Sequence, residues 1–294
     1  MLSPRYVVIS PIRNEEEYLA LTIASMCAQT AKPLKWVLVD DGSSDRTGAL
    51  IEEAAKQHPW IVAVHRKDRG SRQAGAGVIE AFYDGYDLVA NDQWDFIAKF
   101  DGDLSFGPDY FESCLREFQA DLNLGIAGGT CCKVIDGRLV AEFGGEPAFH
   151  VRGPTKIYRR QCFDSIDGLI QAPGWDTVDQ VKANMLGWKT LTFQHIHLVH
   201  HRPTGGAYGS WANWIKNGLA NYIAGYHPIF MVCKCLKRAL ARPSPAGIRE
   251  GLGLWCGFMK GYLKRIPKVA DPAMIRYLRI QQWRALTFRR SLWP

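Results

Sequence analysis

Short, almost wholly apolar runs alternate with longer amphipathic stretches over residues 5–129. The apolar runs have the length of β-strands and lie at 5–10, 35–40, 60–65, 95–100 and 124–129. The stretches between them place apolar side chains at helical spacing, as in Leu19, Ile23 and Met26. Strand–helix–strand units of this kind are right-handed and bring their strands together in parallel. The alternation therefore predicts an α/β fold built on a parallel sheet.

Polar loops follow four of these predicted strands. They read SPIRNEE, DDGSSD, RKDRGSRQAGAG and DGDLSFGP. In an open parallel sheet the carboxyl ends of the strands meet at one edge, and ligands bind there. We therefore expect Arg13, Asp40, Asp41, Asp101 and Asp103 to face the same crevice.

Asp101 and Asp103 stand one residue apart, directly after the apolar run DFIAKF. Asp-Gly is a favoured turn dipeptide, so the motif by itself also fits a solvated turn. Mg²⁺ and Mn²⁺ prefer carboxylate oxygens and commonly share their remaining ligands with substrate phosphates. The pair is thus a candidate site for a divalent cation and a diphosphate.

The rest of the chain has a different pattern. Residues 130–160 contain short runs of alternating polarity, which are typical of antiparallel strands. A helix is expected within 172–188 and a strand over 189–201. Residues 205–294 have a helical pattern and many aromatic side chains.

Charge is distributed unevenly along the chain. Residues 1–229 carry 22 Lys and Arg against 27 Asp and Glu, a net charge of −5, whereas residues 230–294 carry 14 against 2, a net charge of +12. Helices that mix basic and aromatic side chains suit an anionic membrane interface. A helical subdomain packed on the core, with a solvated basic face, is the alternative.

Three further observations bear on location. No run reaches 18 apolar residues, so we expect no membrane-spanning helix. The beginning, MLSPRYVVIS, has no signal-peptide features. The eight cysteines form no C-x-x-C pair, which favours reduced thiols. We therefore expect a cytoplasmic protein, either free or peripheral on the inner face of the cell membrane.

Four motifs, SPIRNEEEYL, VLVDDGSSDRT, RGSRQAGAG and KFDGDLSF, occur in this order. Together they resemble an inverting, nucleotide-sugar-dependent glycosyltransferase of family two. The resemblance implies the GT-A fold, with a Rossmann-like, mostly parallel sheet flanked by helices, a short antiparallel acceptor-side portion and a C-terminal helical extension. It also implies a glycosyltransferase domain over 1–204, with a nucleotide-sugar half (about 1–104) and an acceptor half (about 105–204), followed by the basic region 205–294.

The resemblance also implies roles for individual residues. Those expected to contact the donor nucleotide are Pro11, Arg13, Glu15, Asp40, Asp41, Arg69, Arg72 and Asp101. The implied cation is Mn²⁺ or Mg²⁺, with Asp103 as its direct ligand and Asp101 near the ribose or the cation. For Asp40 and Asp41 an Asx turn is the structural alternative, and for the two arginines it is solvated surface charge.

In the family an acidic motif supplies the catalytic base at the start of a later helix. The matching stretch here is GWDTVDQVKANMLGW, in which Trp175 replaces the first acid. Asp176 takes the place of the base, and Asp179 follows one turn later. Either residue would also suit the acidic first turn of a helix.

The family often has a histidine that contacts the metal or the diphosphate after the next strand. The stretch HIHLVHHR offers His200, with His201 beside it. A strand histidine that only makes structural hydrogen bonds is the alternative.

The implied enzyme transfers a sugar, with a UDP-sugar as the expected donor, to a hydroxyl of a saccharide or lipid-linked saccharide. Bacterial surface-polysaccharide assembly is a fitting setting. A polyprenyl-phosphate glycosyltransferase, whose acceptor is a lipid phosphate, is the alternative.

Other function classes fit less well. A nucleic-acid-binding protein would leave the acidic loops unexplained and set them against a polyanion, so we expect no nucleic-acid partner. A nucleotidyltransferase would begin with a Gly-rich phosphate loop, which SPIRNEEEYL lacks. A non-catalytic sugar-nucleotide-binding module remains an alternative that a transfer assay separates.

Overall fold

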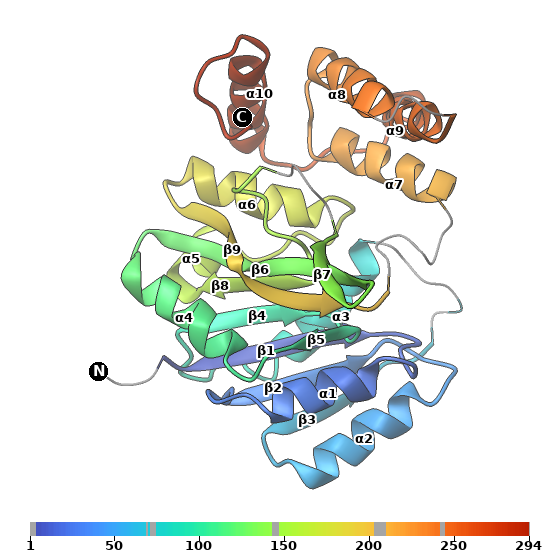
Figure 1. Ribbon diagram of the computed structural model, residues 1–294. Helices are drawn as coiled ribbons and strands as arrows, with labels where there is room; N and C mark the ends of the chain where they lie inside the picture. Colours follow the sequence, from blue (N-terminus) through green and yellow to red (C-terminus); the bar gives the residue numbers. More distant parts are fainter. Residues whose placement is uncertain are drawn as a thin grey trace. The chain divides into compact units, whose positions relative to one another are not determined.

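The computed structural model describes residues 4–68, 70, 75–142, 147–202, 210–241 and 245–293. The chain divides into two compact units. The first unit comprises Met1–Gln171 and Leu186–Arg202, and the second comprises Ala172–Met185 and Pro203–Pro294. Figure 1 shows the elements of both units, each of which is described by itself below.

The described strands of the first unit form one nine-stranded sheet. Its order is β3-β2-β1-β4-β8-β6-β9-β5, and β7 pairs with β6 outside this path. The strands are β1 (Tyr6–Ile12), β2 (Lys35–Asp40), β3 (Ile61–His65), β4 (Phe96–Phe100), β5 (Leu104–Phe106), β6 (Leu124–Ile135), β7 (Arg138–Ala141), β8 (Thr155–Arg159) and β9 (Lys189–His200).

The sheet combines a parallel half with a mixed half. Strands β3, β2, β1 and β4 are parallel neighbours. Strand β8 is antiparallel to β4 and β6, β9 is parallel to β6, and β5 is antiparallel to β9. The expected parallel α/β unit and the antiparallel portion beyond it are both present. The short strand β5, which follows the Asp101–Asp103 loop, was not anticipated.

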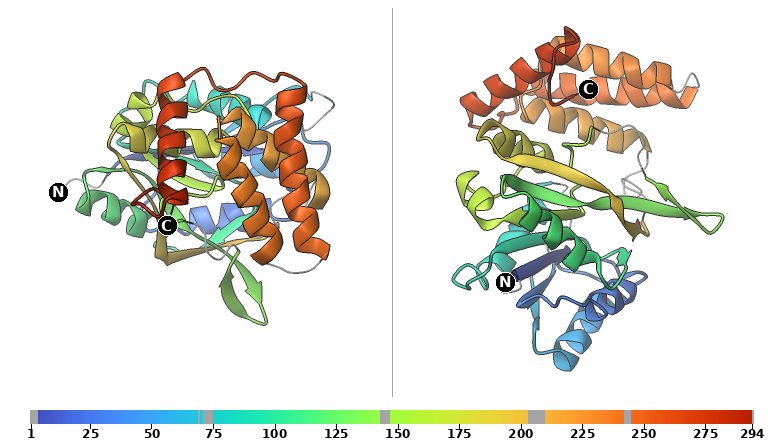
Figure 2. Two further views of the ribbon diagram at one scale, coloured as in Figure 1. Left: turned by 90° about the horizontal axis from the view of Figure 1, so that it is seen from above. Right: turned by 60° about the vertical axis from the view of Figure 1, so that its left-hand side comes forward.

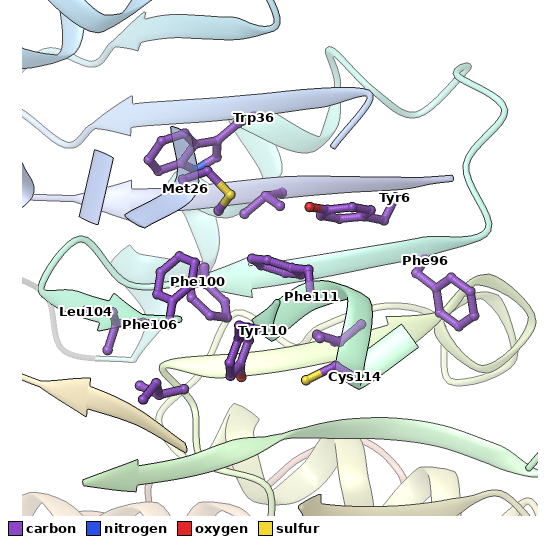
Figure 3. Packing of buried hydrophobic residues seen from close by; sticks show 14 of the residues in the cluster. Tyr6, Met26, Trp36, Phe96, Phe100, Leu104, Phe106, Tyr110, Phe111 and Cys114 are labelled. Carbon is purple, nitrogen blue, oxygen red and sulfur yellow. The ribbon is translucent and has the colours of Figure 1, made fainter. Parts of the chain in front are cut away.

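Helices cover both faces of this sheet (Figure 1). They are α1 (Leu19–Cys27), α2 (Thr47–Gln57), α3 (Ala76–Tyr86), α4 (Tyr110–Ala120) and α5 (Arg160–Ser165). Buried side chains of α1 and α4 join those of the sheet in one hydrophobic cluster, in which Tyr6 stacks on Phe111 with a centroid distance of 4.8 Å. Figure 3 shows this packing.

On the other face, α3 lies against β1 and β2. This helix approaches the sheet closely at Gly85, where an added Cβ would lie 2.7 Å from a methyl carbon of Ile9. Apolar strands covered on both faces explain why the runs in the sequence are continuously apolar rather than alternating.

Pro11 lies inside β1, a strand with neighbours on both sides. Proline lacks the N–H that a central strand normally donates. The pairing of β1 with β4 ends at Ile9, whereas its pairing with β2 continues to Ile12. Pro11 therefore lies where β1 has a single neighbour, and the strand tolerates it there.

Strand β9 departs from simple alternation. Its register with β6 shifts between Gly129 and Thr130, which pair with Phe193 and His197. Phe193 and His200 are both buried although their numbers differ in parity, because the irregularity reverses which face each later side chain occupies.

The second unit is helical, as expected for the C-terminal region. It contains α6 (Trp175–Met185), α7 (Ser210–Ile223), α8 (Pro228–Ala241), α9 (Pro245–Leu263) and α10 (Pro272–Leu286). Helix α6 contacts α10, and Lys182 lies 3.8 Å from Asp271. The segment 172–185 therefore groups with the later helices rather than with the sheet. Over the described residues, none of the helices is both long and apolar enough to cross a membrane.

Candidate functional site

The loops after β1 and β2 are joined by hydrogen bonds. Asn14, which has a φ of 53°, donates its main-chain N–H to Ser43 Oγ at 3.0 Å. Its side-chain oxygen accepts from the Ser44 N–H at 2.9 Å. The Glu15 N–H donates to the buried Thr47 hydroxyl at 2.8 Å. The two loops are thus held together at the carboxyl ends of β1 and β2.

Asp40 hydrogen-bonds within its own loop and to His65. Its Oδ1 accepts from the Ser43 N–H at 2.8 Å, and its Oδ2 lies 3.2 Å from His65 Nδ1. Gly42 has a φ of +75°, and a Cβ there would lie 2.5 Å from Asp68 Cα. Glycine is therefore required for this turn.

Asp41 lies within a group of alternating charges. Its Oδ1 is 2.5 Å from Arg66 Nη1, and Arg66 Nε is 2.5 Å from Asp84 Oδ2. Arg13 donates to the Asp41 carbonyl oxygen at 2.5 Å and to Asp68 Oδ1 at 2.7 Å. The hydrogen bond from Arg13 lowers the pKa of Asp68. Arg13 and Asp41, both expected at the nucleotide, do lie together.

Glu15 has a partner distant in sequence. Its buried carboxylate oxygen Oε2 lies 2.7 Å from Nη2 of Arg202, which follows β9. Arg202 also donates to the Asn14 carbonyl oxygen at 3.0 Å. The end of β9 is thereby tied to the first loop.

The Asp101–Asp103 loop is held from both sides. The Asp101 N–H donates to the Pro154 carbonyl oxygen at 3.1 Å. The buried Thr22 hydroxyl of α1 donates to the Gly102 carbonyl oxygen at 2.8 Å. Lys99, on β4 and 2% exposed, forms an ion pair with the Asp101 carboxylate.

Asp103 is buried and faces His200 across the β5–β9 pair. Its Oδ2 lies 3.5 Å from His200 Nε2, and His200 Nδ1 lies 2.9 Å from Glu142 Oε2. Arg152 Nη2 lies 3.6 Å from the same Glu142 oxygen. Burial opposes protonation of His200, but hydrogen bonds and charges of Asp103 and Glu142 outweigh it and raise the pKa of His200 to about 9.

The residues at Asp103 fit a divalent cation. Asp103 Oδ1 is buried, and no described residue supplies a hydrogen-bond partner for it. A buried carboxylate oxygen without a partner is costly, and a cation would satisfy it. Among the described residues no cluster of three or more His, Cys, Asp or Glu could hold a metal by itself. A cation here would therefore need ligands from a bound molecule, as Mg²⁺ commonly has.

His201 is engaged elsewhere. Its main-chain N–H donates to the Asp103 carbonyl oxygen at 2.9 Å, and its Nε2 lies 2.5 Å from Ser105 Oγ. Its ring stacks on Tyr18 with a centroid distance of 5.4 Å. Of the two neighbouring histidines, His200 is the one whose ring faces the Asp103 carboxylate.

Asp176 and Asp179 lie on α6 in the second unit. Asp176 is in the first turn, and its carbonyl oxygen accepts from Gln180 Nε2 at 2.5 Å. The buried Asp179 carboxylate accepts from the Gln180 N–H at 2.6 Å. Burial raises the pKa of Tyr226, and the charge of Asp176 adds to that shift. Asp176 itself is half-buried, so it is the more exposed of the two aspartates.

Arg69 and Arg72 lie outside the described residues. Several residues found around the loops were not expected from sequence: Arg66, Asp68, Lys99, Glu142, Arg152 and Arg202. Only Lys99 left a visible signal, a charged residue within the apolar run FIAKF. The other five come together through pairings that no local pattern reports.

Residues 7–139 match the model of the family described as glycosyl transferase family 2. The similarity to this family thus covers less than half of the chain. The matched segment contains Arg13, Asp40, Asp41, Asp101 and Asp103.

Several curated bacterial proteins are similar to this chain. The chain is 33% identical over 181 residues to a polyprenol monophosphomannose synthase of Mycolicibacterium smegmatis, covering 55% of this chain and 64% of that protein. It is 25% identical over 181 residues to the putative glycosyltransferase EpsH of Bacillus subtilis, covering 56% and 50%. It is 49% identical over 61 residues to an undecaprenyl-phosphate 4-deoxy-4-formamido-L-arabinose transferase of Pectobacterium carotovorum, covering 19% of each. The chain thus spans less than two thirds of each of these relatives.

Solved structures agree on the fold. The mannosyltransferase PcManGT from Pyrobaculum calidifontis, in complex with GDP-Man and Mn²⁺, has a TM-score of 0.55 and 19% identity, with 98% of this chain and 76% of that chain covered. TarS residues 1–349 from S. aureus have a TM-score of 0.54 and 16% identity, with 95% and 77% covered. The fold of the chain is accordingly GT-A.

Proposed function

We propose that the protein is a glycosyltransferase that moves a sugar from a nucleoside-diphosphate sugar to an acceptor, with a divalent cation at Asp103. The buried Oδ1 of Asp103, for which the described part of the chain supplies no hydrogen-bond partner, carries this proposal. It lies within the segment that matches family 2, at the carboxyl end of the parallel strands where nucleotides bind in such sheets.

The donor nucleotide would lie against the joined loops after β1 and β2. Arg13 already donates to the Asp41 carbonyl oxygen there, and Arg66 holds the Asp41 carboxylate, so little reordering is needed on binding. Asp103, with His200 in its neutral form, would hold Mn²⁺ or Mg²⁺, and Asp101 would lie beside them. When bound, the cation would act as a Lewis acid and neutralise charge on the diphosphate.

Asp176 is proposed as the general base for a hydroxyl acceptor. Its carboxylate takes the hydroxyl proton as the acceptor oxygen forms a bond to the anomeric carbon. The bond from that carbon to the diphosphate breaks at the same time, and the diphosphate leaves with the electron pair. Attack from the face opposite the leaving group inverts the anomeric centre.

A lipid phosphate is the alternative acceptor. Two relatives whose names include a polyprenol or undecaprenyl-phosphate favour it. A phosphate oxygen is already anionic, so transfer to it needs no proton removal. Asp176 would then contribute little to the rate.

Donor binding gives the first test. The melting temperature of the full chain is measured with UDP-, GDP- and dTDP-sugars, with and without Mn²⁺. A ligand at 100 times its Kd stabilises a protein by about 2.7 kcal/mol, so one donor is expected to raise the melting temperature only when the cation is present. No cation-dependent shift with any donor, and no release of nucleoside diphosphate, would contradict the proposal.

A further inference from the structure

Helix α8 exposes an apolar stripe. The exposed residues recur at helical spacing and are Ile229, Val232, Cys233, Leu236 and Leu240. Leu236 is 57% exposed and Leu240 is 74% exposed. Scattered exposed apolar residues are ordinary, but a solvated helix normally places polar side chains at the centre of its outer face. This stripe therefore indicates that something covers α8.

Helix α9 continues the same feature. Its inner face approaches α7 and α8 through glycines: a Cβ at Gly257 would lie 1.9 Å from the Ile215 carbonyl oxygen, and one at Gly251 would lie 2.7 Å from that of Cys235. The opposite face exposes Ile248 (54%), Leu252 (53%) and Leu263 (80%). Helix α8 packs on α9 and contacts α10, and Figure 2 shows the three helices in one layer.

Helix α10 adds Ile280 and Trp283, which are 43% and 50% exposed. We call the exposed residues of α8, α9 and α10 together the outer helical surface. Its basic, exposed members are Lys237, Arg249, Lys260, Arg276 and Arg284.

Acidic residues offset little of this charge. Residues 230–294 contain two acids, Glu250 and Asp271. Glu250 Oε2 lies 2.6 Å from Arg238 Nε, and Asp271 Oδ2 lies 3.8 Å from Lys182 Nζ. The outer helical surface therefore combines aliphatic stripes with strong positive charge.

We propose that the outer helical surface binds an anionic lipid bilayer, with its aliphatic stripes in the membrane interface and its Lys and Arg side chains at the headgroups. Charge complementarity selects this partner. A second copy would bring two segments of net charge +12 together, which is unfavourable. A nucleic acid would match the charge but leave the aliphatic side chains in water. The inference goes beyond the proposed sugar transfer and does not depend on it.

Vesicle flotation of the full chain tests the proposal. Vesicles of phosphatidylcholine alone are compared with vesicles containing about 30% phosphatidylglycerol, at low and high salt. One double variant, Leu236→Ser with Leu252→Ser, removes apolar area. Another, Lys237→Gln with Lys260→Gln, removes charge. The matched controls in the first unit are Leu122→Ser, at a residue 73% exposed, and Lys56→Gln, at an exposed residue of α2.

We expect binding to the anionic vesicles only, weakened by salt. The charge variant should lower the partition coefficient about 30-fold, since each Lys near the surface contributes about fivefold. The apolar variant should lower it at least about tenfold, and both controls should bind like the unaltered protein. Equal loss in the controls, no vesicle binding, or concentration-dependent dimerisation that the apolar variant abolishes would each overturn the proposal. Donor-dependent melting shifts, measured without lipid, report separately on the proposed transferase.

Discussion

At the scale of single residues, the two aspartates of KFDGDLSF occupy different environments. The Asp101 carboxylate is paired with the buried Lys99, whereas Asp103 is buried beside His200 with one oxygen unpartnered among the described residues. The difference supports a direct role for Asp103 toward a cation and a supporting role for Asp101.

Asp103→Ala should therefore abolish cation-dependent donor binding, because it removes the proposed protein carboxylate ligand. Asp101→Ala should only weaken it. Isothermal titration with the donor, with and without Mn²⁺, measures both effects. Asp87→Ala is the matched control, since Asp87 is exposed at the end of α3. Undiminished cation-dependent binding in Asp103→Ala would place the cation elsewhere.

Asp176→Asn should lower kcat by about 10²–10⁴-fold, the usual contribution of a general base, and leave donor affinity nearly unchanged. The amide keeps the shape of the side chain but cannot take a proton. Steady-state kinetics with a hydroxyl acceptor measure the effect. Asp179→Asn is the comparison: a larger kcat loss there than in Asp176→Asn would identify Asp179 as the base.

At the scale of elements, close packing of helices depends on glycine. Helix α9 meets α7 so closely that the Gly257 Cα leaves no room for a side chain. A glycine within a helix is less stable than an alanine by about 1 kcal/mol. Tertiary packing must outweigh that cost here.

Gly257→Ala should accordingly destabilise the protein by about 1–3 kcal/mol, the typical cost of overpacking, despite the better helix propensity of alanine. Thermal or urea unfolding followed by circular dichroism measures the change. Gly107→Ala is the control, because within 4 Å a Cβ there would meet only the Asp109 carboxylate, at 3.1 Å. A Gly257→Ala protein as stable as the unaltered chain would mean that α7 and α9 are not packed this closely.

At the scale of the whole molecule, the class of acceptor separates the two proposed reactions. Both should stop when a chelator removes divalent cations and resume when Mn²⁺ or Mg²⁺ is restored. Only the hydroxyl reaction should depend on Asp176. Product analysis with a polyprenyl phosphate and with a saccharide acceptor, each with the Asp176→Asn variant, measures this. Turnover that persists in the chelator would remove the cation from both schemes.

Much of the fold could be predicted because its strands and helices are specified by patterns of residues close together in the sequence. The runs at 5–10, 35–40, 60–65 and 95–100 became β1 to β4, since continuous apolar segments of that length are stable only when covered on both faces. The place of Asp101 and Asp103 at a strand end followed from the same pattern.

The tertiary structure decided which distant side chains pair with the residues of the candidate site. Arg66 on Asp41, Arg202 on Glu15 and Glu142 on His200 join residues 25 to 187 positions apart. Hydrogen bonds and ion pairs between loops depend on strand order and register, which periodicity does not encode. The register shift between β6 and β9, after which His200 is buried beside Asp103, likewise depends on strand pairing.

The sequence by itself thus determined the layered α/β architecture, the acidic strand ends and the positive charge of the C-terminal helices, because each depends on residues close together in the chain. Only the tertiary structure decided that Asp101 pairs with Lys99, that Asp103 is buried with one oxygen unpartnered among the described residues, and that aliphatic residues of α8 and α9 face outward. All three depend on which side chains the fold brings into the space nearby.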